Sequence, residues 1–371
     1  MTRKRAGLPV IDLFAGAGGL SVGATDVGCD VRTSVEIDAH ACNTLQANDL
    51  YHGAVLRADV AALTGLDLRE AACLAPGDPL IVVGGAPCQP FSKAAYWTEE
   101  GDESRYRRAR AAGIVMDRPP PPTKARTDAR RTLVEEFWRL IFESDADGFV
   151  FENVPSIKHP RNRPVLDGFR HAAEVAGYSV AEVTANAAEH GVAQTRQRVF
   201  LLGARAAKPV PPTPTHSLDG GKPALTPAVT AGEALEGLDG PEHFEPEEVV
   251  TGRWAKHLET VPPGQNYKAH TAWAGHPEPT FVTETRFWNF LLKLSPDRPS
   301  WTLAASPGPW VGPFHWESRR LRTVELAALQ GFPRDYQIVG NRRERVRQIG
   351  NAVPPPMAGR MVEAVAAVVG R

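Results

Sequence analysis

Short apolar runs alternate with amphipathic stretches along the first 203 residues. The apolar runs predict buried strands at residues 10–14, 31–35, 55–60, 80–83, 148–151, 178–185 and 199–203. The stretches between them predict helices at residues 20–27, 37–48, 132–142 and 165–176. Strands that alternate with helices are typical of a Rossmann-like α/β domain with a mixed, mostly parallel sheet. Two further helices are predicted at 324–330 and 357–369, and prolines begin the second.

The pattern weakens after residue 203. Residues 204–317 are rich in Pro and Gly and carry six of the eight tryptophans, most of which we expect in a core. Residues 231–250 hold seven acids and no Lys or Arg, and we expect this run to point into solvent. These shifts predict three parts: an α/β domain at 1–203, a smaller irregular domain at 204–318, and a segment at 319–371 that returns to the first domain.

Charge is distributed unevenly, although the 371 residues carry a formal net charge of only -1. A nucleic-acid partner would therefore be held by local surfaces. Residues 104–131 hold nine Lys or Arg against two acids, and residues 315–371 hold ten arginines against five acids. The first of these segments predicts a basic lid that closes over a polyanion; a solvated insertion is the alternative.

The four cysteines are Cys29, Cys42, Cys73 and Cys88, and no two have CxxC spacing. This pattern predicts neither a zinc site nor a disulfide framework, and reduced thiols fit best. No apolar run approaches the ~18 residues of a membrane span. We therefore expect a soluble, cytoplasmic protein without a metal.

A glycine-rich turn, residues 15–20, joins the first predicted strand to the first helix. Such a turn lets a nucleotide-like cofactor approach the backbone at a helix N-terminus, whereas a plain tight turn is the alternative. No Gly-Lys-Ser/Thr follows, which excludes a P-loop. Glu36 ends the second strand, 20 residues after Gly16, where a carboxylate can accept hydrogen bonds from ribose hydroxyls or remain solvated. Asp59 can accept from an adenine amino group or cap a turn.

Chemically active side chains follow three later strands. The loop from Gly84 to Ser92 places Cys88 at the carboxyl edge of the sheet, as a nucleophile or a small buried side chain. Glu152 ends the next strand. Arg196 and Arg198 share one face of an extended segment, which suits contacts to an anion or a base edge; an exposed hairpin is the alternative.

The order of these motifs resembles that of the DNA cytosine-5 methyltransferases, in particular the bacterial modification enzymes. The motifs are Ala15-Gly16-Ala17-Gly18-Gly19, Glu36, Pro87-Cys88-Gln89, Glu152-Asn153-Val154, Gln194-Thr195-Arg196-Gln197-Arg198, Leu329-Gln330-Gly331-Phe332-Pro333 and Gly350-Asn351-Ala352-Val353-Pro354-Pro355. The resemblance covers about residues 8–203 and 319–364. It implies that residues 204–318 form a target-recognition domain.

The resemblance also implies roles for the residues. Cys88 would be the nucleophile, Glu152 would hold the N3 edge of the cytosine, Arg198 its O2 edge, and Arg196 would support the ring or phosphate contacts. S-adenosylmethionine would be the cofactor. Its binding residues would be Phe14, Ala17, Gly18, Gly19, Glu36, Ile37, Asp59, Val60, Gly85, Pro87, Leu133, Asn351 and Val353. DNA contacts would come from Gln89, Ser92, Arg105, Arg107 and Arg108.

The implied reaction is methylation of C5 of a flipped-out cytosine in a specific double-stranded DNA sequence. A monomer is expected, with a restriction endonuclease that acts on the same site as a partner in function only. Three departures from the family pattern concern the long segment before Asp128, His190 with Ala193, and residues 321–325. A catalytically silent DNA-binding relic and an RNA cytosine-5 methyltransferase remain the alternatives.

Overall fold

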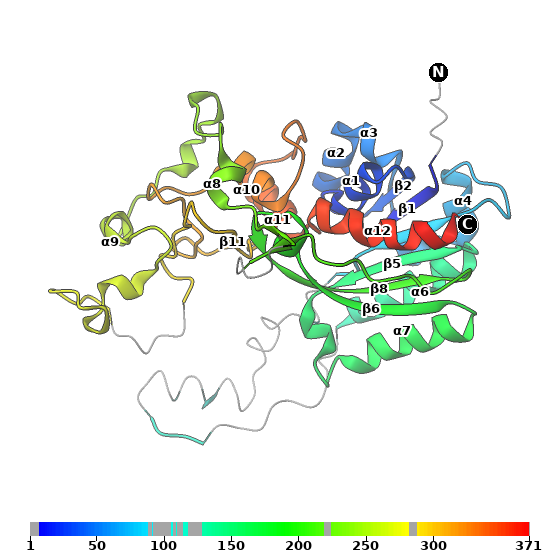
Figure 1. The fold of residues 1–371 in the computed structure, drawn as a ribbon, viewed down its shortest axis with the longest axis horizontal. Helices are drawn as coiled ribbons and strands as arrows, with labels where there is room; N and C mark the ends of the chain where they lie inside the picture. The colour runs from blue at the N-terminus through cyan, green and yellow to red at the C-terminus, as the bar shows by residue number, and fades with distance from the viewer. Residues whose placement is uncertain are drawn as a thin grey trace.

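A seven-stranded sheet forms the centre of the domain at the right of Figure 1. The computed structural model describes residues 7–87, 91, 105–106, 109, 114–117, 128–218, 224–281 and 288–370. The strand order is β3-β2-β1-β4-β5-β8-β6, and only β8 runs antiparallel to its neighbours. The strands are β1 (Pro9–Leu13), β2 (Asp30–Glu36), β3 (Ala54–Arg57), β4 (Ile81–Gly84), β5 (Gly148–Asn153), β6 (Ser179–Asn186) and β8 (Gln197–Ala204). The predicted α/β class with a mixed, mostly parallel sheet is confirmed.

Helices cover both faces of this sheet. They are α1 (Gly19–Asp26), α2 (Ala39–Ala47), α3 (Asp49–His52), α4 (Gly65–Ala71), α6 (Leu133–Glu143), α7 (Arg163–Val175) and α12 (Pro355–Val369). Helices α10 (Thr323–Gln330) and α11 (Arg342–Asn351) do not cover the sheet and pack against each other in a separate core. Side chains of α4, α6 and α7 form one hydrophobic core with the sheet, and those of α1 and α12 form another. Figure 1 shows α12 lying across β5 and β8, although it is the last helix of the chain.

Alternation along the strands divides their side chains between the two cores. Val150 packs toward α12, whereas Phe149 and Phe151 pack toward α6 and α7. Every residue of β5 is buried, since a strand at the centre of a doubly covered sheet has no solvent face. Glu152 and Asn153, at the end of β5, are therefore held in a fully buried part of the sheet.

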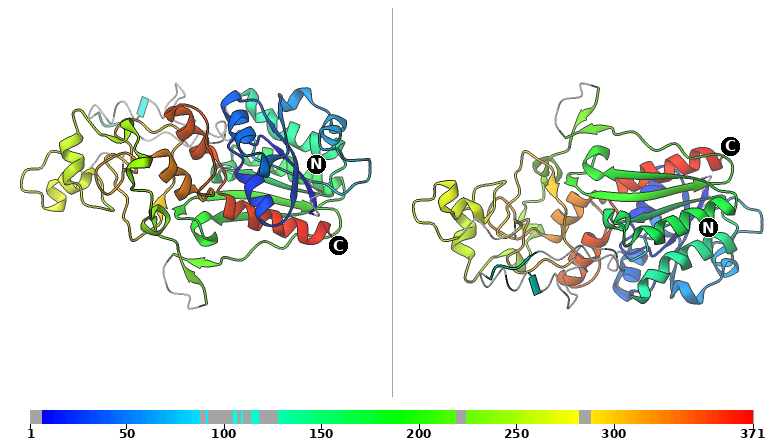
Figure 2. Two further views of the ribbon diagram at one scale, coloured as in Figure 1. Left: turned by 90° about the horizontal axis from the view of Figure 1, so that it is seen from above. Right: turned by 90° about the horizontal axis from the view of Figure 1, so that it is seen from below.

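Residues after β8 form an elongated, mostly irregular region beside the sheet domain (Figure 2). Its regular elements are short: β9 (His216–Ser217), β10 (Thr226–Pro227), α8 (Ala231–Leu235), α9 (Ala255–Thr260) and β11 (Ser300–Trp301). A small core around Leu258, Tyr267 and Leu291 supports part of it. We call residues 204–318 the recognition region; its boundaries stay a prediction.

The expectations for this region hold in part. Four of its six tryptophans are partly buried and pack against small cores, namely Trp254, Trp301, Trp310 and Trp316, whereas Trp273 is 79% exposed. The expectation for the acidic run is wrong. The acidic run does not point uniformly into solvent, because Glu248 is buried against Arg322 and Glu245 pairs with Arg342. Elsewhere, β3 ends at Arg57 rather than at residue 60, and the helices α3, α4 and α11 had not been predicted.

Candidate active site

The glycine-rich turn is closely packed between the end of β1 and the start of α1. Gly18 has a φ of 81°, a left-handed conformation that favours glycine, and it caps α1. A Cβ on Gly19 would lie 2.0 Å from the carbonyl oxygen of Val353, so this position must be glycine. The glycine-rich turn and the segment around Val353 therefore pack directly against each other, although they lie near opposite ends of the chain.

The Glu36 carboxylate lies against this turn. It accepts hydrogen bonds from the backbone N–H groups of Gly16 at 2.7 Å, Ile37 at 2.8 Å and Asp38 at 2.8 Å. Beside it, the Ile37 side chain is 61% exposed, although it is large and apolar. A fixed carboxylate next to an exposed apolar side chain suits a ribose and its attached base.

The remaining predicted cofactor residues lie on several elements. Asp59 is exposed, and one of its carboxylate oxygens accepts a hydrogen bond from the backbone N–H of Ala61 at 3.0 Å. Asp59 therefore caps a short 3₁₀ turn, which is one of the two roles predicted for it. Val60 and Val353 are buried, Leu133 is half-buried at the start of α6, and Asn351 is exposed at the end of α11. Their cofactor contacts stay predictions.

The loops after β4 and β5 lie side by side. Gly84 is in register with Phe151, and a Cβ built on Gly85 would lie 2.8 Å from Oε2 of Glu152. Asn153 Nδ2 donates to the carbonyl oxygen of Ala86 at 3.1 Å. The Glu152 carboxylate is thus in contact with the backbone that leads to Cys88.

Cys88 itself lies outside the described residues, as do Gln89, Ser92, Arg107 and Arg108. Phe91 is described and is fully buried in the core beneath the Arg131 guanidinium, 4.9 Å from the ring centroid. Arg105 is described and exposed. The basic lid and the DNA contacts of this segment stay predictions.

Glu152 forms a buried ion pair with Arg198. Arg198 Nε lies 2.8 Å from Glu152 Oε1, and its terminal nitrogen donates to the Gln197 carbonyl at 2.7 Å. Glu152 is 8% exposed. Burial raises the pKa of the Glu152 carboxyl above its ordinary value, while the charges of Arg198 and Arg196 oppose that rise. The site therefore holds a carboxyl group that keeps a proton more readily than an exposed glutamate does.

Arg196 has a different environment from Arg198. It is 1% exposed, and it donates to the carbonyl oxygens of Gly350 at 2.7 Å and Leu303 at 3.3 Å. These bonds join the strand end to the returning segment and to the recognition region. The arrangement suits a supporting role and does not suit direct contact with a phosphate.

A buried polar network under the glycine turn was missed at the level of the sequence. Tyr336 donates its hydroxyl hydrogen to the Ala17 carbonyl at 2.7 Å, and its oxygen lies 2.7 Å from His52 Nε2. Because the hydroxyl has one hydrogen, His52 must donate from Nε2. Burial lowers the pKa of His52 to about 3, so the ring is neutral. The partners come from segments 284 residues apart, which no local pattern reveals.

Asp12 is a further buried polar side chain near the glycine turn. It accepts from Ser21 Oγ at 2.6 Å, and burial raises its pKa to about 7. The only sign of this buried acid in the sequence was its position within the apolar run 10–14. Together with Tyr336 and His52, Asp12 supports the glycine turn from below.

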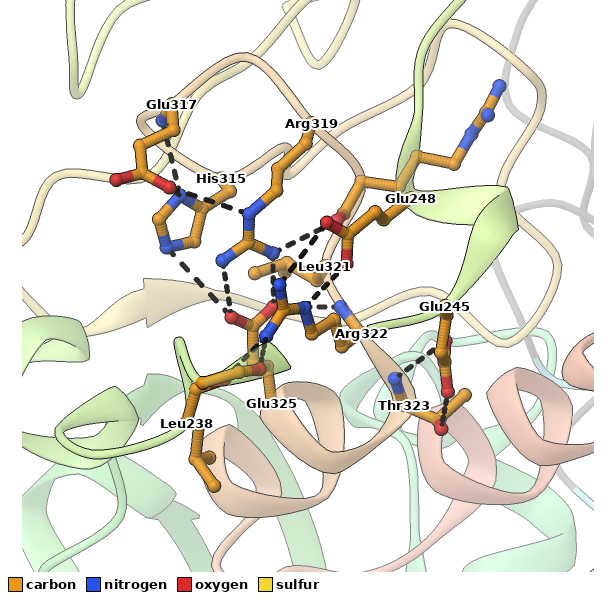
Figure 3. Close-up of polar contacts among 12 residues, drawn as sticks. Leu238, Glu245, Glu248, His315, Glu317, Arg319, Leu321, Arg322, Thr323 and Glu325 are labelled. Carbon is orange, nitrogen blue, oxygen red and sulfur yellow. Dashed lines mark hydrogen bonds and ion pairs between the residues drawn. The ribbon is translucent and has the colours of Figure 1, made fainter. Parts of the chain in front are cut away.

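A cluster of ion pairs joins the recognition region to the start of α10 (Figure 3). Arg322 contacts both oxygens of Glu248 and donates to the carbonyls of Leu238 and Gly240, each at 2.9 Å. Arg319 donates to both oxygens of the buried Glu325, at 2.8 and 2.7 Å. Of the unusual residues 321–325, Arg322 and Thr323 thus bind to this chain's own acidic run, at Glu248 and Glu245.

Comparison with known proteins agrees with this geometry. The family model for the C-5 cytosine-specific DNA methylases matches residues 8–367. The chain belongs to this family. It is therefore a DNA (cytosine-5-)-methyltransferase, and the resemblance inferred from the motifs is confirmed.

Individual relatives match over nearly their whole length. The Type II methyltransferase M.SacI of Streptomyces achromogenes is 37% identical, over 96% of this chain and 92% of the relative. M.NgoFVII of Neisseria gonorrhoeae is 28% identical, over 93% of this chain and 83% of the relative. A prophage-encoded E. coli protein described as a DNA modification methyltransferase shares the fold, with a TM-score of 0.67, 21% identity, and coverage of 98% and 100% of the two chains.

Among the described residues, no group of three or more His, Cys, Asp or Glu could hold a metal ion. None of the helices in the described ranges is both long and apolar enough to cross a bilayer.

Proposed function

We propose that this methyltransferase transfers a methyl group from S-adenosylmethionine to C5 of a flipped-out cytosine in a specific duplex DNA sequence. The reaction would pass through a covalent bond between Cys88 and C6 of the base. One observation carries the proposal: the buried Glu152–Arg198 pair touches the backbone that leads to Cys88.

The chemistry explains why this pair is needed. Cytosine C5 is a poor nucleophile until a thiolate adds to C6 and turns the ring into an enamine. Negative charge would then build on the ring. A carboxyl group with a raised pKa can hold the proton at N3, and a guanidinium can bind O2.

The proposed reaction has two stages, addition with methyl transfer and then elimination. The Cys88 sulfur bonds to C6, and C5 takes the methyl group, which leaves a neutral thioether on the donor. A base then removes the C5 proton, the C6–S bond breaks, and the 5,6 double bond returns with release of the thiolate. The cofactor supplies only the electrophilic methyl group.

Cys88 is favoured over the other cysteines as the nucleophile. Cys29 and Cys42 are buried, and burial raises the pKa of Cys29 to about 11 and that of Cys42 above its ordinary value. Cys73 is exposed but follows α4, a helix that ends away from the carboxyl edge of the sheet. A thiolate at that edge, beside Glu152, is therefore best supplied by Cys88.

The residues at the glycine turn fit S-adenosylmethionine. Glu36 would bind the ribose hydroxyls, Ile37 would pack on the adenine, and the turn from Phe14 to Gly19 would hold the methionine part. Tyr336 and His52 would keep the turn in place, and Asp59 has a second carboxylate oxygen that can accept from the adenine amino group.

Duplex DNA is the proposed substrate, because the relatives are named Type II methyltransferases. A base inside a duplex cannot reach a buried carboxyl, so it must be flipped out. Modification of one base at a time suits a monomer acting in the cytoplasm. A restriction endonuclease for the same sequence would be a partner in function without being bound.

The test is nucleoside mass analysis of duplex DNA incubated with the protein and S-adenosylmethionine. We expect 5-methylcytosine with the unmutated protein and none with Cys88→Ser, which should still bind DNA and cofactor. Equal methylation by Cys88→Ser would refute the thiol mechanism. Methylation of tRNA but not of duplex DNA would favour the RNA enzyme, and DNA binding with no methylated base would favour the silent relic.

A further inference from the structure

The start of helix α2 is joined to helix α11 by an ion pair. Arg347, in the second half of α11, donates to Asp38 Oδ2 at 3.0 Å, although the two residues are 309 apart in the sequence. Asp38 is also the N-cap of α2, because its Oδ1 accepts from the backbone N–H of Ala41 at 2.9 Å. One carboxylate thus caps α2 and receives a guanidinium from the returning segment.

The backbone of Asp38 is bonded to the carboxylate beside the glycine turn. Its N–H donates to Glu36 Oε1 at 2.8 Å, and this oxygen also accepts from the N–H of Ile37. The other oxygen, Oε2, accepts from the N–H of Gly16. Three backbone groups therefore orient Glu36, and one of them belongs to the residue that Arg347 holds.

The rest of α2 is joined to the same segment independently of this ion pair. Asn48 donates to the carbonyl oxygen of Gln337 at 2.8 Å and accepts from its N–H at 3.0 Å. Thr44 Oγ1 accepts from the N–H of Val339 at 2.9 Å. Both side chains on α2 are buried. Because these bonds hold the middle and the end of α2, loss of Arg347 should loosen only its start.

The ion pair is about one-third exposed, with side-chain values of 33% for Asp38 and 34% for Arg347. Burial alone would raise the pKa of Asp38, but the hydrogen bonds from Ala41 and Arg347 lower it, so the carboxylate stays charged. Glu344 also contacts Arg347, at 2.6 Å, and holds the guanidinium along α11. A pair with this exposure is expected to change an affinity by about two- to fivefold.

We propose that Arg347 is a positioning residue for the ribose of the cofactor, because it holds Asp38 and thereby the orientation of the Glu36 carboxylate. Arg347 would act without touching the cofactor. The inference rests on the proposed function, since it takes Glu36 as the residue that binds the ribose hydroxyls. It adds a residue of the returning segment to those that determine cofactor affinity.

The test is calorimetry of the full-length protein with two ligands, S-adenosylhomocysteine and its 2′,3′-dideoxy analogue, which lacks both ribose hydroxyls. Arg347→Ala should raise Kd for S-adenosylhomocysteine by about two- to fivefold and leave Kd for the analogue unchanged. In methyl transfer, KM for S-adenosylmethionine should rise by the same factor while kcat is unchanged. An equal rise in Kd for both ligands would indicate a general loosening of the site and would overturn the proposal.

Two variants of the same helix are matched controls. Arg343→Ala also removes one positive charge, at an exposed side chain that makes no ion pair within the described part of the chain. Glu344→Gln removes the other carboxylate beside Arg347 and leaves the bond to Asp38 in place. Both variants should keep the Kd of the unmutated protein. An unchanged Kd in Arg347→Ala, or an equal rise in Arg343→Ala, would contradict the assignment.

A double-mutant cycle with Glu36→Ala separates this inference from the proposed function. Once Glu36 is absent, Arg347→Ala should not raise Kd further, whereas full additivity of the two losses would overturn the positioning role. If Glu36→Ala weakens binding and Arg347→Ala does not, only the positioning role fails. If Glu36→Ala leaves Kd unchanged, the proposed ribose site fails and the inference fails with it.

Discussion

Replacing Arg322 by Ala tests how the recognition region is attached. Arg322 is 6% exposed and Glu248 7% exposed, so the pair is almost entirely out of water (Figure 3). The substitution leaves the Glu248 carboxylate buried without its partner and removes the donor to two carbonyls. Breaking one side of a buried ion pair costs about 3–5 kcal/mol, and we expect a loss of this size in the free energy of unfolding.

Urea unfolding followed by tryptophan fluorescence measures this loss, since six of the eight tryptophans lie in the recognition region. Arg334→Ala is the control, because Arg334 is exposed and donates to a single carbonyl. Arg322→Met with Glu248→Leu should recover much of the stability, because no buried charge then remains. A loss below about 1 kcal/mol for Arg322→Ala would refute the reasoning, since that is the range of an exposed pair.

The contribution of the Arg322–Glu248 pair to the free energy of unfolding depends on pH. The hydrogen bond from Arg322 lowers the pKa of Glu248. Its contribution to stability is therefore complete above the ordinary pKa of a glutamate and is lost as the pH falls through the lowered value.

Three further predictions concern the active site. Tyr336→Phe removes two buried hydrogen bonds under the glycine turn, so Kd for S-adenosylmethionine should rise about tenfold in calorimetry while DNA affinity is unchanged; an equal loss of both affinities would contradict a local role. Asp12 has a raised pKa of about 7, so stability should fall from pH 4 to pH 7 by up to about 4 kcal/mol, and Asp12→Asn should flatten this fall in urea titrations; a parallel profile would count against the raised pKa. Glu152→Gln should lower kcat by about 100-fold or more in a methyl-transfer assay with DNA affinity retained, and full activity would exclude proton sharing at N3.

The sequence predicted the parts of the site that depend on strand ends. Glu152 lies beside the loop of Cys88 because the carboxyl ends of parallel strands meet at one edge, and β4 and β5 are neighbours. The glycine turn and Glu36 were found for the same reason. The motifs then gave a family that the comparisons confirm.

The residues that the sequence did not reveal depend on contacts between distant segments. Helix α11 begins with Arg342-Arg343-Glu344-Arg345 and buries only three residues near its end, so it has no apolar stripe to recognise. Tyr336 and His52 meet beneath the turn without any local spacing rule. The acidic run 231–250 appeared solvated because its arginine partners come from the returning segment: Arg322 is 74 residues from Glu248, and Arg342 is 97 residues from Glu245.

The most direct test of the account is to trap the covalent intermediate. A duplex that carries 5-fluorocytosine at the target position cannot lose a proton from C5, so the adduct should persist in the presence of S-adenosylmethionine. The account predicts a protein–DNA adduct in denaturing mass spectrometry, with the DNA on the peptide that contains Cys88 and no adduct in Cys88→Ser. An adduct at another residue, or 5-methylcytosine formation without any trapped adduct, would contradict it.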